Sequence, residues 1–371
     1  MTPAPAFAPA VPLNDLQRQT ASVREDIDAA IAAVVASGWY VLGPMVSAFE
    51  AEFAAYNGVP HCISVANGTD AIELALRAVG CGPGREVVAV ANAGMYAATA
   101  VLAVGARAVF ADIEPAGMTM DPGSLERVIG PETAAVVVTH LYGQLADMER
   151  LLAMTRARGV PLIEDCAQAH GAERNGRRAG AAGAVGCFSF YPTKNLGGLG
   201  DGGALLAQDA EIAERLRRLR QYGWRSRYVS EAYGRNSRLD EIQAAVLRAK
   251  LPRLDGWNAR RREIVAAYRD AARDSLVFPD PSGRDYVGHL CVVRSSGRDA
   301  LRAHLERRGI RTDIHYPGPD HWQSAMRDHL GDQIPLPQTE AAVAEVLTLP
   351  CFPELTGEEI AGVCAALAEF R

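Results

Sequence analysis

The sequence contains almost no lysine. Of its 38 basic residues, only Lys194 and Lys250 are lysines, and all the others are arginines. Arginine stays protonated in proteins, so it cannot act as an amine nucleophile towards a carbonyl group. Each of the two lysines is therefore a candidate for such chemistry, and an ordinary structural lysine is the alternative in both cases.

The chain also lacks the marks of secreted, membrane and nucleic-acid-binding proteins. Its seven cysteines are an odd number without a CxxC pair, which favours a reducing cytoplasm over a disulfide framework or a zinc site, and no metal site is predicted. The N-terminus shows no basic segment followed by an apolar one, so no signal peptide is expected. The uncharged runs 29–49 and 87–106 are interrupted by glycine, proline or asparagine and predict no membrane span. A net charge of −6 leaves no basic face for nucleic acid.

Short β-branched runs alternate with helical patterns over the first two-thirds of the chain. This alternation predicts βαβ units, which form a mostly parallel sheet with helices on both faces. The predicted strands are 61–66, 86–90, 108–112, 134–140, 160–164, 186–190 and 204–207. The predicted helices between them include 69–79, 148–158 and 210–221.

The last third of the sequence predicts a smaller α+β domain. Ser237 and Asp240 have the spacing of a capping box, which indicates a helix start there. The later predicted elements are a long connecting helix at 255–273, a strand at 289–294 and helices at 299–308 and 358–370. We therefore predict a large domain over residues 12–252 and a small C-terminal domain over 253–371.

Lys194 follows an apolar predicted strand and begins a glycine-rich loop. Burial beside a strand end lowers the pKa of an amine and makes it a nucleophile towards aldehydes. The segment 198–203 matches the GxGxxG spacing, but it leads from a lysine into an apolar run. A dinucleotide site needs that spacing between a strand and a helix, so none is predicted here.

Asp165 stands at the end of another apolar predicted strand, where parallel sheets bind ligands. A helix cap is the alternative for this residue taken alone. Pyridoxal phosphate requires a lysine for its aldehyde and an acid that faces its ring nitrogen. The pair Lys194 and Asp165 therefore predicts a pyridoxal phosphate site.

Three further residues suit the phosphate and the ring of that cofactor. Gly68 and Thr69 lie at a turn from a strand into an amphipathic helix, where free N–H groups favour an anion. Ser189, five residues before Lys194, offers another hydroxyl. Tyr96 begins a predicted helix and either stacks on the cofactor ring or packs in the core.

Taken in order, the motifs of this chain resemble the sugar-nucleotide aminotransferases of the DegT/DnrJ/StrS group. The resemblance runs from about residue 12 to the C-terminus and is carried by an ordered set of segments. These segments are 67–71, 105–112, 140–144, 164–171, 189–196, 236–245, 315–317 and 349–353.

The resemblance implies an α/β protein with the fold-type I architecture of pyridoxal-phosphate-dependent transferases. It also implies an obligate homodimer with active sites at the subunit interface. Lys194 would bind the cofactor aldehyde, Asp165 would face the ring nitrogen, Gln168 would lie near the ring hydroxyl and Tyr96 would stack on the ring. The phosphate would be held by Gly68, Thr69, Ser189 and, from the second subunit, Asn236.

The resemblance further implies transfer of an amino group from L-glutamate to a keto group of a dTDP-linked keto-deoxysugar, in amino-sugar or natural-product biosynthesis. The segments 140–144 and 94–96 are similar to those of enzymes that act at C-3 rather than C-4. Met95 stands where many relatives have threonine, which puts the shape of the substrate pocket in doubt. The candidate substrate-binding residues are Arg225, Arg227, Tyr228 and Tyr316, and a solvated loop is the alternative for the first three.

Three other functions remain open for this sequence. The first is a C-4 nucleotide-sugar transaminase. The second is an amino-acid transaminase or lyase of the same fold, although we find no arginine clamp for an α-carboxylate. The third is a non-catalytic regulator that binds pyridoxal phosphate.

Overall fold

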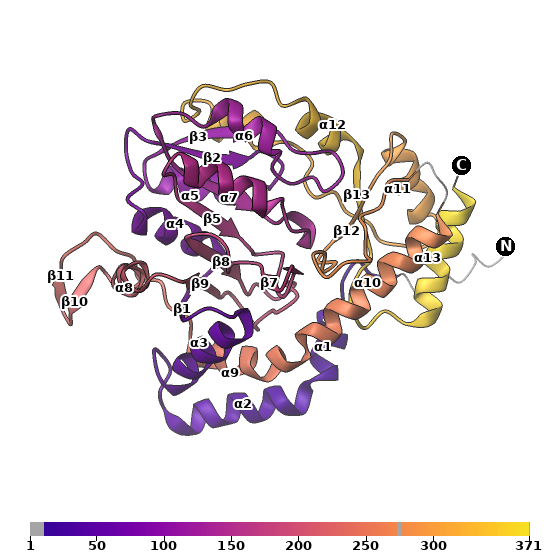
Figure 1. The fold of residues 1–371 in the computed structure, drawn as a ribbon. Coiled ribbons are helices and arrows are strands. Elements are labelled where there is room, and N and C mark those ends of the chain that lie inside the picture. Colours follow the sequence, from indigo (N-terminus) through magenta and orange to yellow (C-terminus); the bar gives the residue numbers. More distant parts are fainter. Residues whose placement is uncertain (1–10, 273–275, 371) are drawn as a thin grey trace.

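The structure is a computed structural model, and it describes residues 11–272 and 276–370 of the chain. The elements form a larger unit around a central sheet and a smaller unit that holds the C-terminal helix (Figure 1). The long helix α10 (Leu254–Ala271) leads from the larger unit into the smaller one (Figure 1).

Seven strands from the described residues form the central sheet, in the order β1-β9-β8-β5-β4-β2-β3. β9 pairs antiparallel with both neighbours, and all other neighbouring strands pair parallel. The seven predicted strands are confirmed, with ends shifted by at most two residues. Their bounds are β1 (His61–Val65), β2 (Glu86–Val90), β3 (Arg107–Ala111), β4 (Thr133–Thr139), β5 (Leu162–Asp165), β8 (Val185–Ser189) and β9 (Gly203–Ala207).

Helices cover both faces of this sheet, which explains why its strands are apolar without alternation. Val87 and Ala89 of β2 pack with α4, α5 and α8, whereas Val88 and Val90 pack with α6 and α7 on the opposite face. The bounds of these helices are α4 (Gly68–Ala78), α5 (Tyr96–Ala103), α6 (Pro122–Val128), α7 (Met148–Ala157) and α8 (Ala210–Leu219). The predicted helices 69–79, 148–158 and 210–221 correspond to α4, α7 and α8.

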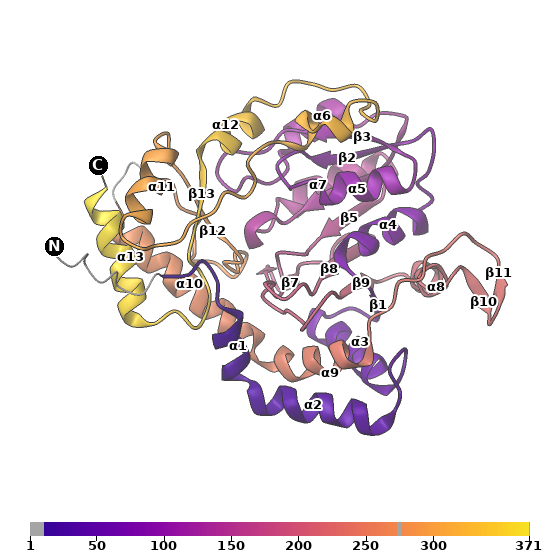
Figure 2. The same ribbon diagram turned by 180° about the vertical axis from the view of Figure 1, so that it is seen from behind.

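A layer of N-terminal helices and α9 (Glu241–Lys250) covers the end of the sheet formed by β1, β9 and β8 (Figures 1 and 2). Phe53 anchors this layer, because its ring meets that of Phe188 edge-on at 5.1 Å. The N-terminal helices are α1 (Leu16–Ser22), α2 (Arg24–Ser37) and α3 (Pro44–Asn57).

The predicted capping box at Ser237 and Asp240 is wrong. Asp240 is the N-cap of α9, but its side chain makes no capping hydrogen bond. Ser237 is buried, and its Oγ accepts a hydrogen bond of 3.0 Å from the N–H of Ala66 beyond β1. The hydroxyl thus satisfies a tertiary contact, which the local sequence pattern does not reveal.

The smaller unit has its own apolar core between α10, α11 (Arg298–Glu306), α13 (Gly357–Glu369) and the antiparallel pair β12 (Cys291–Arg294) and β13 (Val346–Leu349). The predicted helices 255–273, 299–308 and 358–370 correspond to α10, α11 and α13, although residue 273 lies outside the described residues. The predicted strand 289–294 begins two residues later, at Cys291.

The predicted domain boundary after residue 252 stays a prediction. Met326 and Leu336, from the C-terminal part, are buried in the apolar cluster of the central sheet. The C-terminal part of the chain therefore packs on the larger unit before it returns to the smaller one.

The remaining described elements are short. They are β6 (Glu173–Arg174), β7 (Arg177–Arg178), β10 (Trp224–Ser226), β11 (Val229–Ser230), α12 (Pro337–Glu345) and the 3-10 turns Leu141–Gly143, Leu251–Arg253, Asp320–Trp322 and Ser324–Met326. None of the helices in the described ranges combines the length and the apolar character that crossing a membrane requires.

Candidate active site

A cavity of about 500 Å³ opens where β4, β5 and β8 end. Its wall includes the last residue of each of these strands, Thr139, Asp165 and Ser189. Ligands of parallel α/β sheets bind at this edge, because the strands present their carboxyl ends there. Eight predicted site residues line the cavity: Gly68, Thr69, Tyr96, Asp165, Gln168, Ser189, Lys194 and Tyr316.

Lys194 contributes a free amine to this cavity. Its side chain is half-buried, and burial lowers the pKa of the amine to about 8, although the charge of Asp165 acts in the opposite direction. Within the described ranges the amine has no hydrogen bond or ion pair. At neutral pH roughly a tenth of such amines are unprotonated, far more than for an exposed lysine. Lys194 is therefore suited to attack an aldehyde.

The loop that carries Lys194 is fixed by hydrogen bonds to two side chains of helix α9. Lys250 Nζ donates to the carbonyl oxygen of Gly197 at 2.8 Å, and Gln243 Oε1 accepts from the N–H of Leu199 at 2.7 Å. Because both partners come from another part of the chain, the tertiary structure rather than the loop itself determines where the amine lies.

Asp165 is a buried carboxylate with few hydrogen-bond donors. Burial raises its pKa, whereas the N–H of Ala167, the charge of Lys194 and the hydroxyl of Thr139 lower it. Its Oδ1 accepts from Ala167 N at 3.1 Å and its Oδ2 from Thr139 Oγ1 at 3.2 Å. On balance the pKa of Asp165 is raised, because burial outweighs these three interactions. A cationic partner in the cavity, such as a protonated ring nitrogen, would therefore stabilise the ionised carboxylate.

Gln168 and two tyrosines form the wall beside Asp165. Gln168 Oε1 accepts from the N–H of Tyr142 at 2.6 Å, and its Nε2 donates to the hydroxyl oxygen of Tyr316 at 3.2 Å. The ring of Tyr316 meets that of Tyr96 edge-on at 6.0 Å. Tyr96 is 49% exposed and borders the cavity, so it is not a core residue. An aromatic face is thus available to a planar ligand.

The N-terminus of α4 and the end of β8 form an anion cradle. A Cβ atom on Gly68 would lie 2.7 Å from Cβ of Ser189, so only glycine permits this close approach. Gly68 and Thr69 are the first residues of α4, where backbone N–H groups lack partners within the helix. Together with the hydroxyls of Thr69 and Ser189, these N–H groups suit a phosphate.

The residues of the cavity therefore fit pyridoxal phosphate. Lys194 offers the amine that captures its aldehyde, Asp165 offers a counter-charge for its ring nitrogen, and the cradle at Gly68 suits its phosphate. These three residues belong to separate segments of the chain, and they meet at the end of the central sheet.

Four predicted residues lie outside the cavity of their own chain: Asn236, Arg225, Arg227 and Tyr228. The hairpin of β10 and β11 projects from the larger unit beyond α8 (Figures 1 and 2). On this hairpin Arg225 pairs with Glu231 at 2.9 Å, and Tyr228 is 74% exposed. Asn236 is also exposed, beside Gln221.

Several residues of the cavity wall were not predicted from the sequence, among them Thr139 and His289. Thr139 lies directly opposite Asp165 in the β4–β5 register. Its position could have been inferred from the sequence, because it is a polar residue near the end of a predicted strand. His289 reaches the cavity from the segment before β12, and no local pattern indicates this.

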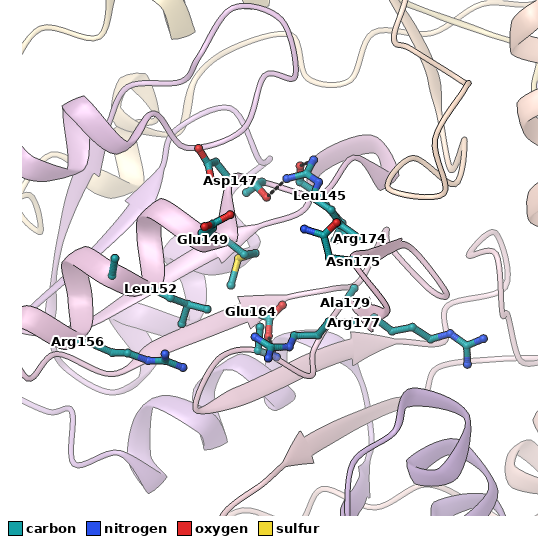
Figure 3. A pocket seen from close by; sticks show the side chains of 15 residues that line it. Leu145, Asp147, Glu149, Leu152, Arg156, Glu164, Arg174, Asn175, Arg177 and Ala179 are labelled. Carbon is teal, nitrogen blue, oxygen red and sulfur yellow. Dashed lines mark hydrogen bonds between the residues drawn. The ribbon is translucent and has the colours of Figure 1, made fainter.

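A second cavity, of about 470 Å³, lies between α7 and the β6–β7 hairpin (Figure 3). Its described wall contains no lysine, cysteine, histidine, serine or threonine. Glu164 lies at its floor, but its carboxylate already accepts hydrogen bonds from His140, Gly180, Ala182 and Gly183. Within the described residues this cavity therefore offers no amine, thiol or hydroxyl nucleophile.

His140, Glu164 and Cys166 bring potential metal-ligand atoms within 4.8 Å of one another. The Glu164 oxygens, however, are occupied by the hydrogen bonds just described, and His140 Nδ1 lies 3.2 Å from the N–H of Ala146. These contacts indicate a structural role for the cluster, to which β5 contributes Glu164.

Comparison with known proteins agrees with this geometry. Residues 21–368 match the DegT/DnrJ/EryC1/StrS aminotransferase family. A dTDP-3-amino-3,4,6-trideoxy-alpha-D-glucose transaminase of Streptomyces venezuelae is 45% identical over 98% of this chain and 97% of its own. The erythromycin biosynthesis sensory transduction protein EryC1 of Saccharopolyspora erythraea is 45% identical over 96% of this chain and 98% of its own.

Among solved structures, DesV of S. venezuelae in complex with a ketimine intermediate superposes with a TM-score of 0.94, at 45% identity and over 98% of both chains. Another solved relative contains the amino form of the pyridoxal phosphate cofactor. The predicted fold-type I architecture, the aminotransferase activity and the pyridoxal phosphate cofactor are thereby confirmed. By motif, fold and active-site geometry, this chain belongs to the DegT/DnrJ/EryC1/StrS aminotransferase family.

Proposed function

We propose that this aminotransferase moves the amino group of L-glutamate to the C-3 keto group of a dTDP-linked keto-deoxysugar, in the biosynthesis of an amino sugar or natural product. The free amine of Lys194 near buried Asp165, in one cavity with an anion cradle, is the observation that carries the chemistry. The S. venezuelae relative, a dTDP-3-amino-sugar transaminase, supports both the sugar nucleotide and the C-3 position. The free state of all seven cysteines supports a reducing, cytoplasmic location.

When bound, pyridoxal phosphate supplies an aldehyde that condenses with amines and a ring that accepts the electrons of a carbanion. Lys194 would hold this group through its Nζ atom. Once free of the cofactor, the amine of Lys194 would remain in the cavity, where its Nζ could accept a proton from the substrate and return it. One residue thus serves as covalent anchor and as general base and acid.

Asp165 stabilises the charge on which this chemistry depends. An ionised Asp165 would keep the ring nitrogen of the bound group protonated, and Thr139 orients this carboxylate through its hydroxyl. The cradle formed by Gly68, Thr69 and Ser189 would hold the phosphate, and Tyr96 and Gln168 would position the ring. The same groups act in both half-reactions, so ping-pong kinetics are expected.

We also propose a homodimer with shared active sites. Asn236, Arg225, Arg227 and Tyr228 lie outside their own cavity, and the exposed side chains of Trp39 (56%) and Tyr233 (76%) suit a partner surface. Asn236 of one chain would bind the cofactor phosphate of the other, and the hairpin residues would bind the sugar pyrophosphate.

Mixing variants tests the shared site. Lys194→Ala and Asn236→Ala homodimers should each be impaired, whereas a heterodimer of the two contains one site with both native residues. Unfolding and refolding an equal mixture should restore about a quarter of the native activity, since half of the dimers are mixed and each has one intact site. If no activity returns although mixed dimers form, Asn236 acts within its own chain.

The function itself is tested with the enzyme in its amino form. We expect this form to react with a dTDP-linked 3-keto-deoxysugar faster than with the 4-keto isomer or with 2-oxo acids other than 2-oxoglutarate. A preference for the 4-keto sugar would identify a C-4 transaminase, and a preference for such 2-oxo acids would identify an amino-acid transaminase. Failure with every acceptor would favour a regulator.

A further inference from the structure

His289 is tied to the residue that follows the cofactor lysine. Its Nδ1 lies 3.0 Å from Oδ1 of Asn195, and both side chains are buried. Asn195 Nδ2 donates to the carbonyl oxygen of Val287 at 3.0 Å and to Oδ1 of Asn258 at 2.8 Å. The opposite orientation of the Asn195 amide would place its oxygen against the Val287 carbonyl, so the orientation is determined by the backbone.

Asn258 reinforces this assignment. Its Nδ2 donates to the carbonyl oxygen of His170 at 2.8 Å, so its Oδ1 is the atom that faces Asn195. Both hydrogen atoms of Asn195 Nδ2 are then in use, and Asn195 Oδ1 can only accept a hydrogen bond. His289 must therefore carry its proton on Nδ1.

The surroundings of His289 favour its neutral imidazole. Burial lowers its pKa well below the usual value, and the positive charges of Lys194 and Arg261 lower it further. A neutral ring that is protonated on Nδ1 has a lone pair on Nε2, which makes this atom a hydrogen-bond acceptor and not a donor.

Among the residues that the structure describes, none donates a hydrogen bond to Nε2 of His289. This atom is nevertheless not sealed inside the protein, because it does not belong to the fully buried polar atoms without a partner. His289 lines both the cavity of Lys194 and an adjoining cavity of about 110 Å³. Thr193, Leu290 and His315 also belong to both walls, so the small cavity extends the larger one. The acceptor is therefore available to a ligand.

The adjoining cavity has a neutral wall. Among the described residues, its wall contains no arginine, lysine or carboxylate, and its polar members besides the two histidines are Asn14, Thr193 and Thr348. A carboxylate of the amino donor or a diphosphate would lack a counter-charge there, and burial of an unpaired anion is costly. A hydroxyl group of a sugar ring carries no charge and can donate to a bare acceptor.

We propose that Nε2 of His289 accepts a hydrogen bond from a hydroxyl group of the keto-sugar, which makes His289 a specificity-determining residue of the sugar half-reaction. This inference rests on the proposed nucleotide-sugar function. An acceptor that is fixed and otherwise unpartnered penalises a sugar that lacks the hydroxyl at this position.

His315 provides an internal contrast on the same wall. Its Nδ1 lies 2.8 Å from the hydroxyl oxygen of Thr348, which can donate or accept. The hydrogen bonds of His315 therefore leave its tautomer free to change, whereas those of His289 do not.

Two substitutions of His289 separate its ring nitrogen atoms. His289→Asn can place an amide N–H near the former Nδ1 and keep the contact with Asn195, but it removes the acceptor at Nε2. His289→Gln can place an amide oxygen near the former Nε2. With equal covalent cofactor loading, we expect His289→Asn to lower kcat/KM for the nucleotide sugar about 10- to 100-fold more than that for L-glutamate. His289→Gln should recover most of this difference.

The reverse order, with His289→Gln more impaired than His289→Asn, would overturn the proposal and indicate that His289 only positions Asn195. Equal effects on both half-reactions would overturn it as well. If the native enzyme accepts no nucleotide sugar at all, the proposed function fails instead, so the two failures are distinguishable.

A measurement on the native protein avoids dependence on the folding of variants. Nitrogen NMR of the holoenzyme labelled at histidine should show one ring with a protonated Nδ1 and a bare Nε2. In titrations with product analogues that lack one hydroxyl each, only one analogue should lose affinity and leave the Nε2 signal unmoved. A protonated Nε2, or an Nε2 signal that no nucleotide sugar moves, would refute the inference.

Discussion

Lys194 and Lys250 are the two lysines of the chain, and burial lowers the pKa of both to about 8. Their surroundings differ. Lys250 is 1% exposed, and its Nζ donates to the carbonyl oxygen of Gly197 at 2.8 Å and to Oε1 of Gln19 at 3.4 Å. Lys194 Nζ has no such partner within the described residues and faces a cavity with Asp165 on its wall.

This contrast shows that a lowered pKa does not by itself make a lysine reactive. The amine of Lys250 is already used as a donor and is enclosed by α9, α1 and the loop of Lys194. The amine of Lys194 is unpartnered and accessible, and these two properties allow it to meet an aldehyde. Access to the cavity and the lack of a hydrogen-bond partner therefore decide which amine can react. Lys250 instead helps to hold the loop that carries Lys194.

Replacement of each lysine tests the contrast most directly. Lys194→Ala should lower turnover by at least about 10⁴-fold, because covalent and acid–base functions are lost together. Lys250→Met should lower it by no more than about tenfold, because it removes one anchor of the loop. Borohydride reduction of the holoenzyme followed by peptide mass analysis should show the cofactor on residue 194 in the Lys250→Met protein. A cofactor adduct on Lys250 would reverse the assignment.

Two adjacent carboxylates on β5 offer the second test. Asp165→Asn should reduce turnover by about 10²- to 10³-fold with the fold retained, because the charge opposite the ring nitrogen is lost. Glu164→Gln is the matched control, since Glu164 does not line the cavity of Lys194. Its carboxylate instead binds His140 and the loop at 180–183. Glu164→Gln should lower the melting temperature more than Asp165→Asn does, and it should lower turnover less. A loss of only a few-fold in Asp165→Asn would show that Asp165 is misplaced.

The pH dependence of cofactor capture sharpens the comparison. Only the unprotonated amine attacks, and the pKa of Lys194 is lowered from 10.5 to about 8. The rate at which apoprotein binds pyridoxal phosphate covalently should therefore rise about tenfold per pH unit below pH 8 and level off above it. Stopped-flow absorbance measures this rate. A rise that continues towards pH 10 would indicate an ordinary solvent-exposed amine.

The smallest effect is expected at Thr139. Thr139→Val removes the hydroxyl that donates to Asp165 at 3.2 Å and should cost about 1 kcal/mol, or about fivefold in turnover. Thr155→Val removes a buried hydroxyl of α7 that bonds only to its own helix, at 3.0 Å to Leu151, and serves as the control. Equal turnover in the two variants would show that Thr139 does not orient Asp165.

The sequence determined the strands of the central sheet, because β-branched runs that are buried on both faces read as continuous apolar segments. It also determined Lys194 and Asp165 as chemical candidates, since few side chains can act as an amine nucleophile or as a buried acid at a strand end. Ser237 shows the limit of such patterns: its spacing to Asp240 fits a helix cap, yet its hydroxyl bonds to Ala66 across the fold.

Only the tertiary structure distinguished the reactive lysine from the enclosed one, brought Thr139 beside Asp165 and turned His289 into the cavity. These outcomes depend on contacts between segments far apart in the chain, such as Lys250 with Gly197 and His289 with Asn195. Local composition carries no information about such contacts, because burial and hydrogen-bond partners arise only when the helices and strands pack together.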